Sequence, residues 1–151
     1  MKNLKKTVLP LLLLGSVFLT SCGGSRQIIH TSNAPEAIGP YSQAVVVDGT
    51  VYCSGQIAID PATNTLIEGD VVAQTHRVMK NLKAVLEAAN SSLEKVTKTT
   101  IFLVNLDDFS KVNDVYATYF SEGNYPARSC VEVSELPKGA LVEIEAIAYQ
   151  K

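Results

Sequence analysis

The sequence predicts an α+β fold, in which two helices pack on one face of a mixed β-sheet. Two segments have apolar residues at helical spacing, and β-branched or alternating runs lie before, between and after them. The expected order along the chain is β-β-α-β-α-β-β. Helices that pack on one side of a single sheet give a two-layer sandwich.

The first two strands are expected to form a hairpin. In the stretch AVVVDGTVYCSGQ, the dipeptide Asp48-Gly49 lies between two apolar runs. Asp-Gly in this setting is one of the strongest short-range signals for a two-residue β-turn. We therefore expect two antiparallel strands that meet at these residues.

Two helices are expected, each with an acidic residue at its start. Asp70 can cap the first helix, which ends at the polar residues 90–92. Asp107 and Asp108 open the second helix, where negative charge suits the helix dipole. The residues expected on the inner side of the first helix are Val72, Met79, Leu82, Leu86 and Ala89, and those of the second are Phe109, Val112, Tyr116, Tyr119 and Phe120.

Further strands are expected between and after the helices. Residues 96–104, VTKTTIFLV, are rich in β-branched side chains and predict a buried or half-buried strand. Residues 127–133 and 141–148 predict two more strands, joined by the turn-forming segment SELPKGA.

One face of the predicted sheet has no helices to cover it. Alternation places Leu141 and Ile147 on the same face as Glu143 and Glu145, so that this second face is partly apolar and partly charged. Other copies of the chain would cover such a face, and we therefore expect a homo-oligomer.

The N-terminal residues have the features of an export signal. Lys2, Lys5 and Lys6 precede an apolar run over residues 8–19. At about 1.5 Å per helical residue this run is too short to span a bilayer core of about 30 Å. It ends in LTSC, which resembles the lipobox of bacterial lipoproteins, in which the cysteine is acylated.

These features predict the organisation of the chain. We expect residues 1–21 to be a lipoprotein signal peptide, residues 22–33 a short polar tether, and residues 34–151 the domain, with lipidation at Cys22. The protein would then be exported and held by its lipid in the bacterial cell envelope, facing the periplasm or the surface. The alternative is a plain secretory signal in which the cysteine is incidental.

The composition of the mature chain disfavours one class of partner. Removal of residues 1–21 leaves 151 − 21 = 130 residues with 13 − 3 = 10 basic and 15 acidic side chains, a formal charge of −5. An acidic domain without a basic run is poorly suited to the phosphate backbone, so we expect no nucleic-acid partner.

The two cysteines after Cys22 are expected to stay unpaired. Alternation points Cys53 away from Ser54, whereas Cys130 shares a face with Arg128. If Ser54 and Arg128 face one pocket, the two thiols face different ways and cannot form a disulfide.

Few residues in the chain could carry chemistry. His30 and His76 are the only histidines and lie far apart without metal-ligand spacing, so neither a metal site nor a Cys/His pair is expected. Arg128 follows Pro126 at the start of a strand, with Glu143 expected on the neighbouring strand. The arginine could bind a carboxylate, and the glutamate could orient or deprotonate a water. From spacing alone, an ion pair or two solvated side chains explain the same residues.

Segments along most of the mature chain resemble the Rid family of reactive intermediate deaminases, also called YjgF or RidA. They are APEAIGPYSQAV, SGQIAID, NLKAVLEAAN, KTTIFLVNLDDFSKVNDVY and YPARSCVEVSELPKGALVEIEAIA, within about residues 33–149. The resemblance implies a homotrimer of chorismate-mutase-like subunits with pockets at the subunit interfaces. It also implies hydrolysis of 2-imino acids of the 2-aminoacrylate type to 2-keto acids and ammonia, without a cofactor.

The resemblance also implies roles for individual residues. Arg128 matches the arginine that binds the substrate carboxylate, and Glu143 matches the glutamate associated with the attacking water. The other residues that match the family pocket are Tyr41, Ser54, Gly55, Asn113 and Cys130. Gly55 and Cys130 would contribute backbone groups, and Asn113 either lines the pocket or ties its helix to the sheet.

Two other functions compete with the deaminase. One is a trimeric, envelope-anchored protein that binds a small carboxylate without significant turnover. The presence of Glu143 beside Arg128 favours the enzyme, because binding alone needs only the arginine. The other is a ribonuclease, as claimed for some relatives, which the charge of −5 disfavours. The expected partners are a small imino or keto acid, other copies of the chain, and the membrane through the lipid.

Overall fold

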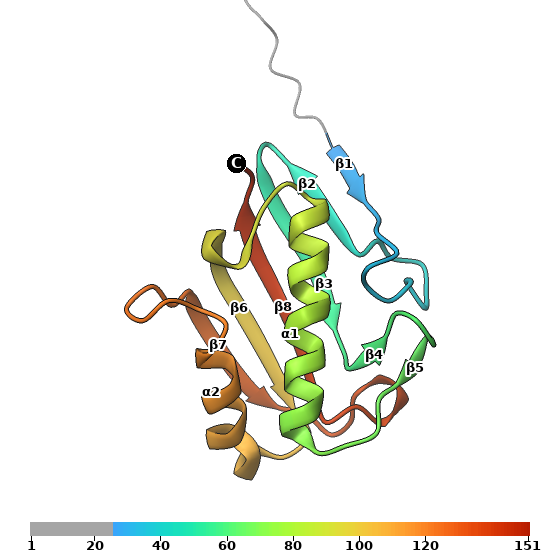
Figure 1. Ribbon diagram of the computed structural model, residues 1–151, viewed down its shortest axis with the longest axis vertical. Helices are drawn as coiled ribbons and strands as arrows, with labels where there is room; N and C mark the ends of the chain where they lie inside the picture. The colour runs from blue at the N-terminus through green and yellow to red at the C-terminus, as the bar shows by residue number, and fades with distance from the viewer. Residues whose placement is uncertain (1–25) are drawn as a thin grey trace, which may run out of the picture.

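Six strands form one mixed sheet in the computed structural model of the chain, which describes residues 26–151 (Figure 1). The strands of this sheet are β1 (Arg26–Ile29), β2 (Ala44–Val47), β3 (Thr50–Gln56), β6 (Val96–Leu103), β7 (Ala127–Glu132) and β8 (Val142–Tyr149). The helices are α1 (Val71–Ala88) and α2 (Phe109–Ala117), and a separate small hairpin consists of β4 (Ile59–Asp60) and β5 (Thr65–Leu66).

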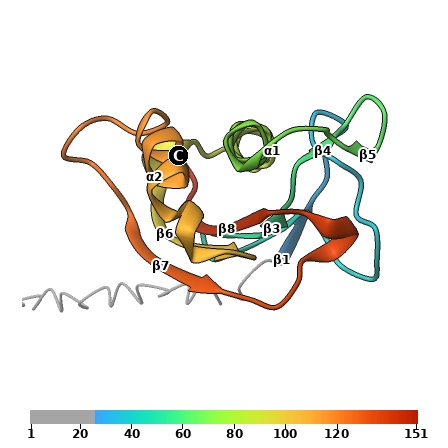
Figure 2. The same ribbon diagram turned by 90° about the horizontal axis from the view of Figure 1, so that it is seen from below.

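The strand order in space is β1-β2-β3-β8-β6-β7. Neighbours pair antiparallel except β6 and β7, which are parallel and are connected through α2. Both helices lie on the same face of the sheet, as Figure 2 shows from below. The α+β sandwich with a mixed sheet is therefore confirmed. No helix of residues 26–151 is long and apolar enough to cross a membrane.

The predicted hairpin and the first helix are confirmed. Asp48 and Gly49 have φ of 49° and 76°, and positive φ at both central residues is what a type I′ turn requires. The side chain of Asp70 accepts a hydrogen bond from the backbone N–H of Ala73 at 2.9 Å and so caps α1. The apolar side chains of α1 that are completely buried against the sheet are Val78, Met79, Leu82, Val85 and Leu86.

The second helix departs from the prediction at its start. Residues Leu106–Asp108 form a 3₁₀ turn, and α2 begins only at Phe109. Val112 and Tyr116 are buried as expected, but Phe109 is 40% exposed, so its place on the inner side was wrong. Phe109 lies in the first turn of α2, where its side chain is exposed but contacts Arg128.

The segment expected as a tether contains a strand. Arg26–Ile29 form β1, which pairs with β2 at the edge of the sheet. Ile29 is buried in the core, whereas Ile28 lies exposed on the opposite face. The alternating burial of these two isoleucines fits a short edge strand. The expected signal peptide and Cys22 lie outside the described residues.

The sheet has one face packed under the helices and one open face. Val142, Ile144, Ala146 and Ala148 of β8 are buried under the helices, and the residues between them point the other way. The large apolar residues exposed on the open face are Ile28, Tyr52, Val131, Ile147 and Tyr149. Leu141 does not join them, because it precedes β8 and packs against the core.

Both cysteines of the described chain are free thiols, as predicted, but for a different reason. Cys53 and Cys130 both lie on the helix side of the sheet, where they contact the same core cluster. Strands β8 and β6 separate them, which at about 4.8 Å per strand keeps them far beyond the Cα distance of about 7 Å that a disulfide allows. Burial raises the pKa of the Cys53 thiol to about 12.

Candidate active site

The predicted site residues divide between two pockets. The Glu143 pocket, of about 400 Å³, lies between the loop before β2, the end of β3 and the start of β8. The Arg128 pocket, of about 330 Å³, lies between α2 and β7. The Glu143 pocket contains Tyr41, Ser54, Gly55 and Glu143, and the Arg128 pocket contains Asn113 and Arg128.

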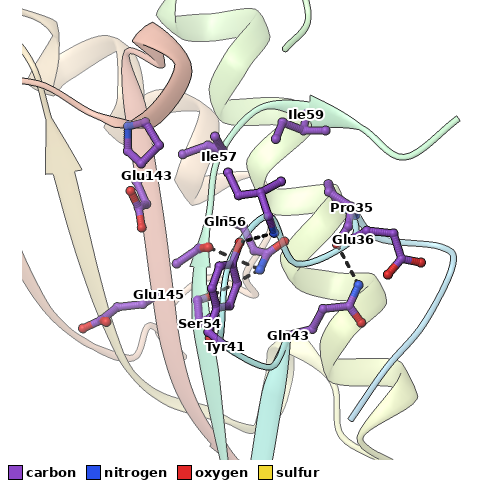
Figure 3. A pocket seen from close by; sticks show the side chains of 13 residues that line it. Pro35, Glu36, Tyr41, Gln43, Ser54, Gln56, Ile57, Ile59, Glu143 and Glu145 are labelled. Atoms are coloured by element: carbon purple, nitrogen blue, oxygen red, sulfur yellow. Dashed lines mark hydrogen bonds between the residues drawn. The ribbon is translucent and has the colours of Figure 1, made fainter. Parts of the chain in front are cut away.

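Gln43 organises the loop that forms one wall of the Glu143 pocket. Its side chain is 3% exposed, accepts a hydrogen bond from the backbone N–H of Thr31 at 2.7 Å, and donates to the carbonyls of Thr31 and Pro35 at 3.0 and 2.7 Å. Each such bond contributes about 1 kcal/mol net, and a buried amide left without partners would cost more. In Figure 3, Glu143 and Glu145 extend from β8 on one side of this pocket, and Pro35 and Glu36 lie on the other.

A bulge in β3 brings Gly55 against Glu143. The register between β3 and β8 shifts between Cys53 and Gln56, so Ser54 and Gly55 leave the regular ladder. A Cβ atom on Gly55 would collide with Oε1 of Glu143 and lie 2.7 Å from its Cδ. The glutamate can occupy this place only because the residue beside it has no side chain.

Glu143 has the electrostatic surroundings of a proton acceptor. Burial raises the pKa of its carboxyl group, and the negative charge of Glu145 raises this pKa further. A carboxylate with a raised pKa is a stronger base than an exposed glutamate. Glu145, which sequence reasoning did not select, thus belongs to the site through its charge.

Ser54 and Tyr41 line the Glu143 pocket with their polar groups partly engaged. The Ser54 hydroxyl donates to the carbonyl of Ser42 at 2.7 Å, which leaves its oxygen free only as an acceptor. The Tyr41 hydroxyl accepts from the backbone N–H of Ile38 at 3.2 Å, and its own proton is free for a ligand. Tyr41 is 47% exposed at the mouth of the pocket.

Arg128 lies in a different kind of surrounding. Its guanidinium carbon is 5.1 Å from the centroid of the Tyr116 ring and 5.6 Å from that of Phe109. Within residues 26–151 it forms no ion pair. Ala117, Tyr125 and Pro126 complete the lining of the Arg128 pocket, so the guanidinium group lies beside mostly apolar side chains.

Arg128 and Glu143 do not meet within one chain. They were expected on neighbouring strands, but β6 lies between β7 and β8. They also occupy opposite faces: Arg128 aligns with Thr99, which is buried under the helices, whereas Glu143 aligns with Phe102 on the other face. The simple ion pair considered from the sequence is therefore excluded within one chain.

The remaining candidates contribute unequally. Asn113 lines the Arg128 pocket, and no hydrogen bond among the described residues ties its side chain to the sheet. Cys130 shares the face of Arg128 as expected but lines neither pocket, and burial raises the pKa of its thiol against the opposing effect of the Arg128 charge. Neither His30 nor His76 lines either of these two pockets.

Two supporting residues were not identified from the sequence. Asn81 on α1 is 1% exposed and donates to the carbonyls of Ile57 and Ile59, at 3.1 and 2.8 Å, which fixes the chain just after the bulge. Gln43 fixes the loop before β2 in the same way, through hydrogen bonds to its backbone. Asn81 could have been found, because a polar residue at a core-facing position of an apolar helix needs a partner. Gln43 precedes a strand and has no comparable pattern.

Comparisons with known proteins agree with this architecture. A family model described as Endoribonuclease L-PSP matches residues 31–150. The chain belongs to this family. It is the family of the Rid proteins, and the resemblance found in the sequence is thereby confirmed. A Rid family protein of Yersinia pestis, YyfA, has a crystal structure with 55% identity and a TM-score of 0.80, covering 83% of this chain and 99% of that one.

Two further Rid family relatives bear on function. The 2-iminobutanoate/2-iminopropanoate deaminase of the mouse is 50% identical over 125 residues, which are 83% of this chain and 92% of the relative. The crystal structure of TdcF from E. coli with bound serine has 44% identity and a TM-score of 0.78, and the match covers 83% of this chain and 99% of that one.

Proposed function

We propose that the protein is a hydrolytic deaminase that converts 2-imino acids, the tautomers of 2-aminoacrylate-type enamines, into 2-keto acids and ammonia. The observation that carries this proposal is that the chain presents, in two separate pockets, an arginine suited to a carboxylate and a glutamate suited to accept a proton. Arg128 has no counter-ion within the described chain, and the Glu143 carboxyl has a raised pKa. The half-identical mouse deaminase supports the choice of substrate class.

The chemistry required of these residues is small. Arg128 binds the substrate carboxylate with two N–H donors and so fixes the position of the imine carbon. Glu143 accepts a proton from a water molecule while the water oxygen attacks that carbon. The nitrogen takes up protons, the C–N bond breaks, and ammonia leaves as the carbonyl forms. Imine and water together thus give one keto acid and one ammonia, without a cofactor.

The proposed site needs a second copy of the chain, because one chain holds Arg128 and Glu143 in separate pockets. A homotrimer would place the Arg128 pocket of one copy against the Glu143 pocket of the next. The open sheet face supports this assembly, since exposed apolar residues such as Tyr52, Ile147 and Val131 favour burial by another copy. Light scattering of the protein should give three times the chain mass, and a monomer at micromolar concentration would contradict the shared site.

The test of the activity is direct. 2-Aminoacrylate or 2-iminobutyrate is generated in situ by a separate enzyme, and the release of keto acid is followed with and without the protein. A clear acceleration over the spontaneous hydrolysis is expected. Hydrolysis at the spontaneous rate, with a correctly assembled trimer, would contradict the deaminase proposal.

A binding protein without turnover is the second candidate. The crystal structure of TdcF supports this candidate, since it contains bound serine, which carries a carboxylate and an amino group. Titration with serine and with a 2-keto acid, beside the hydrolysis assay, separates the two: binding without hydrolysis identifies the binding protein. We do not propose an endoribonuclease, because Glu36, Glu143 and Glu145 line the larger pocket and would repel phosphate.

The location of the protein is proposed from its first residues. Anchoring through a lipid on Cys22 would leave only residues 23–25 before β1, so that the four steps from Cys22 to Arg26 span about 14 Å at about 3.5 Å per step. The domain would therefore stay close to the membrane surface. A Cys22→Ala variant should lose lipid labelling and move to the soluble fraction. If it stayed processed and membrane-bound, the lipoprotein proposal would be wrong.

A further inference from the structure

The guanidinium of Arg128 is held by two aromatic rings. The distances of 5.6 and 5.1 Å to the ring centroids of Phe109 and Tyr116 are within the range of about 6 Å that is typical of cation–π contacts. An arginine held by a carboxylate would have to give up that pair before it could bind a ligand carboxylate. Aromatic rings contact the face of the guanidinium and leave the N–H groups at its edge unpaired.

Helix α2 places both rings on one stripe. Phe109, Asn113 and Tyr116 are separated by four and three residues, so they share one side of the helix. This stripe faces β7, because Asn113 and Tyr116 line the pocket together with Arg128. Phe109, whose exposure at the start of α2 was not predicted from the sequence, thus contacts the guanidinium of Arg128.

The Tyr116 ring cannot readily move. Tyr116 is 3% exposed, packs on Phe120 with ring centroids 4.7 Å apart, and has its hydroxyl 2.8 Å from Oγ1 of Thr99. Thr99 is completely buried and lies directly opposite Arg128 in the pairing of β6 with β7. The strand neighbour of Arg128 therefore fixes the ring that holds Arg128.

We propose that Phe109 and Tyr116 are positioning residues, which hold the guanidinium of Arg128 ready for a ligand carboxylate in place of a counter-ion. The identity of the ligand rests on the function proposed above, but the arrangement of the three side chains does not. Loss of one ring frees Arg128 to sample other conformations. Binding of the carboxylate then weakens, while the proton transfer at Glu143 is left intact.

Phe109→Leu is the variant that tests this role. Phe109 is 40% exposed, so leucine should not prevent folding. Since an exposed cation–π contact contributes about 0.5–1 kcal/mol, the Kd for 2-oxobutanoate should rise roughly two- to five-fold, with KM rising and kcat little changed. Phe109→Trp should restore binding because it restores the aromatic face. Tyr119→Leu is the matched control, since Tyr119 contacts His76 and not Arg128.

A second measurement does not depend on activity. The sequence contains only three arginines, Arg26, Arg77 and Arg128, so their Nε–H resonances in the full chain can be assigned by single Arg→Lys variants. Ring currents should shift the Arg128 resonance, and Phe109→Leu should reduce this shift. The Arg77 resonance should not change, because Arg77 lies beside Asp60, 3.7 Å away.

The two measurements separate the possible failures. If the wild-type protein binds no keto acid and hydrolyses no imine, the proposed function is wrong, and the Arg128 resonance alone decides the positioning role. An Arg128 resonance that stays unchanged in Phe109→Leu overturns the positioning proposal in either case. A lower affinity that Phe109→Trp does not restore also overturns it, because the loss then reflects general disruption.

Discussion

The Glu143 pocket and the Arg128 pocket hold their charged groups by different means. Glu143 is half-buried, lies against a glycine in a β-bulge, and is surrounded by backbone that Gln43 and Asn81 hold with hydrogen bonds. Arg128 is exposed and lies against two rings of α2. The acidic group is therefore sensitive to backbone geometry and local charge, and the basic group to side-chain packing. Variants in the two pockets should consequently fail in different ways.

The largest effect is expected from Glu143→Gln. Glutamine is nearly isosteric but cannot accept a proton from water, and loss of a general base costs about 10²–10⁴-fold in rate. The rate of keto-acid release should fall by this factor, while titration shows 2-oxobutanoate bound as in the wild type. A variant that hydrolyses imines at the wild-type rate would remove Glu143 from the mechanism and strengthen the binding-protein alternative.

Arg128→Lys should produce the opposite pattern, in which binding is lost first. Lysine keeps the charge but cannot form two parallel N–H bonds to one carboxylate. Loss of a hydrogen bond to a charged group costs about 1.5–3 kcal/mol, so the Kd for 2-oxobutanoate should rise about 10- to 100-fold. Arg77→Lys is the control, because Arg77 lies outside both pockets. Unchanged binding by Arg128→Lys would show that the carboxylate binds elsewhere.

Gly55→Ala should act on Glu143 alone. The added Cβ would occupy the space of the glutamate side chain, which has to move away. Misplacement by about 1 Å can cost 100-fold, and because the side chain can partly adjust we expect a loss of kcat of about tenfold. The double variant Gly55→Ala/Glu143→Gln should be no slower than Glu143→Gln by itself. Additive losses in this cycle would mean that Gly55 acts through its backbone or the substrate.

The smallest effect is expected from Glu145→Gln, and it concerns pH. Glu143 must be ionised to accept a proton, so the rate should fall as pH decreases through its pKa, which burial and Glu145 both raise. Removal of the Glu145 charge lowers the pKa of Glu143, so the acidic limb of the pH–rate profile should move to lower pH. Burial is the larger cause, and part of the shift should therefore persist. An acidic limb that stays in place would show that another group titrates.

Much of the fold could be predicted because its signals are local. The Asp48-Gly49 turn, the Asp70 cap and the apolar stripe of α1 each depend on residues a few positions apart, and all were found where expected. Gly55 was selected only through the family resemblance, and Glu143 was a candidate that spacing alone did not separate from a solvated side chain. Their contact depends on a register shift between β3 and β8, which spacing along the chain does not show.

The tertiary structure alone decided how the site is divided. The sequence places Arg128 and Glu143 on strands that follow one another along the chain, but it does not show whether those strands are neighbours in the sheet. In the structure β7 pairs with one edge of β6 and β8 pairs with the other, so β6 lies between Arg128 and Glu143. The register of the two pairings also places the two side chains on opposite faces. The pairing of strands that are distant in sequence depends on the apolar area that whole sheet faces bury, and each residue contributes only a small part of that area. The sequence by itself therefore determined which residues are candidates for the chemistry, and the packing of the sheet determined that no single chain brings Arg128 and Glu143 together.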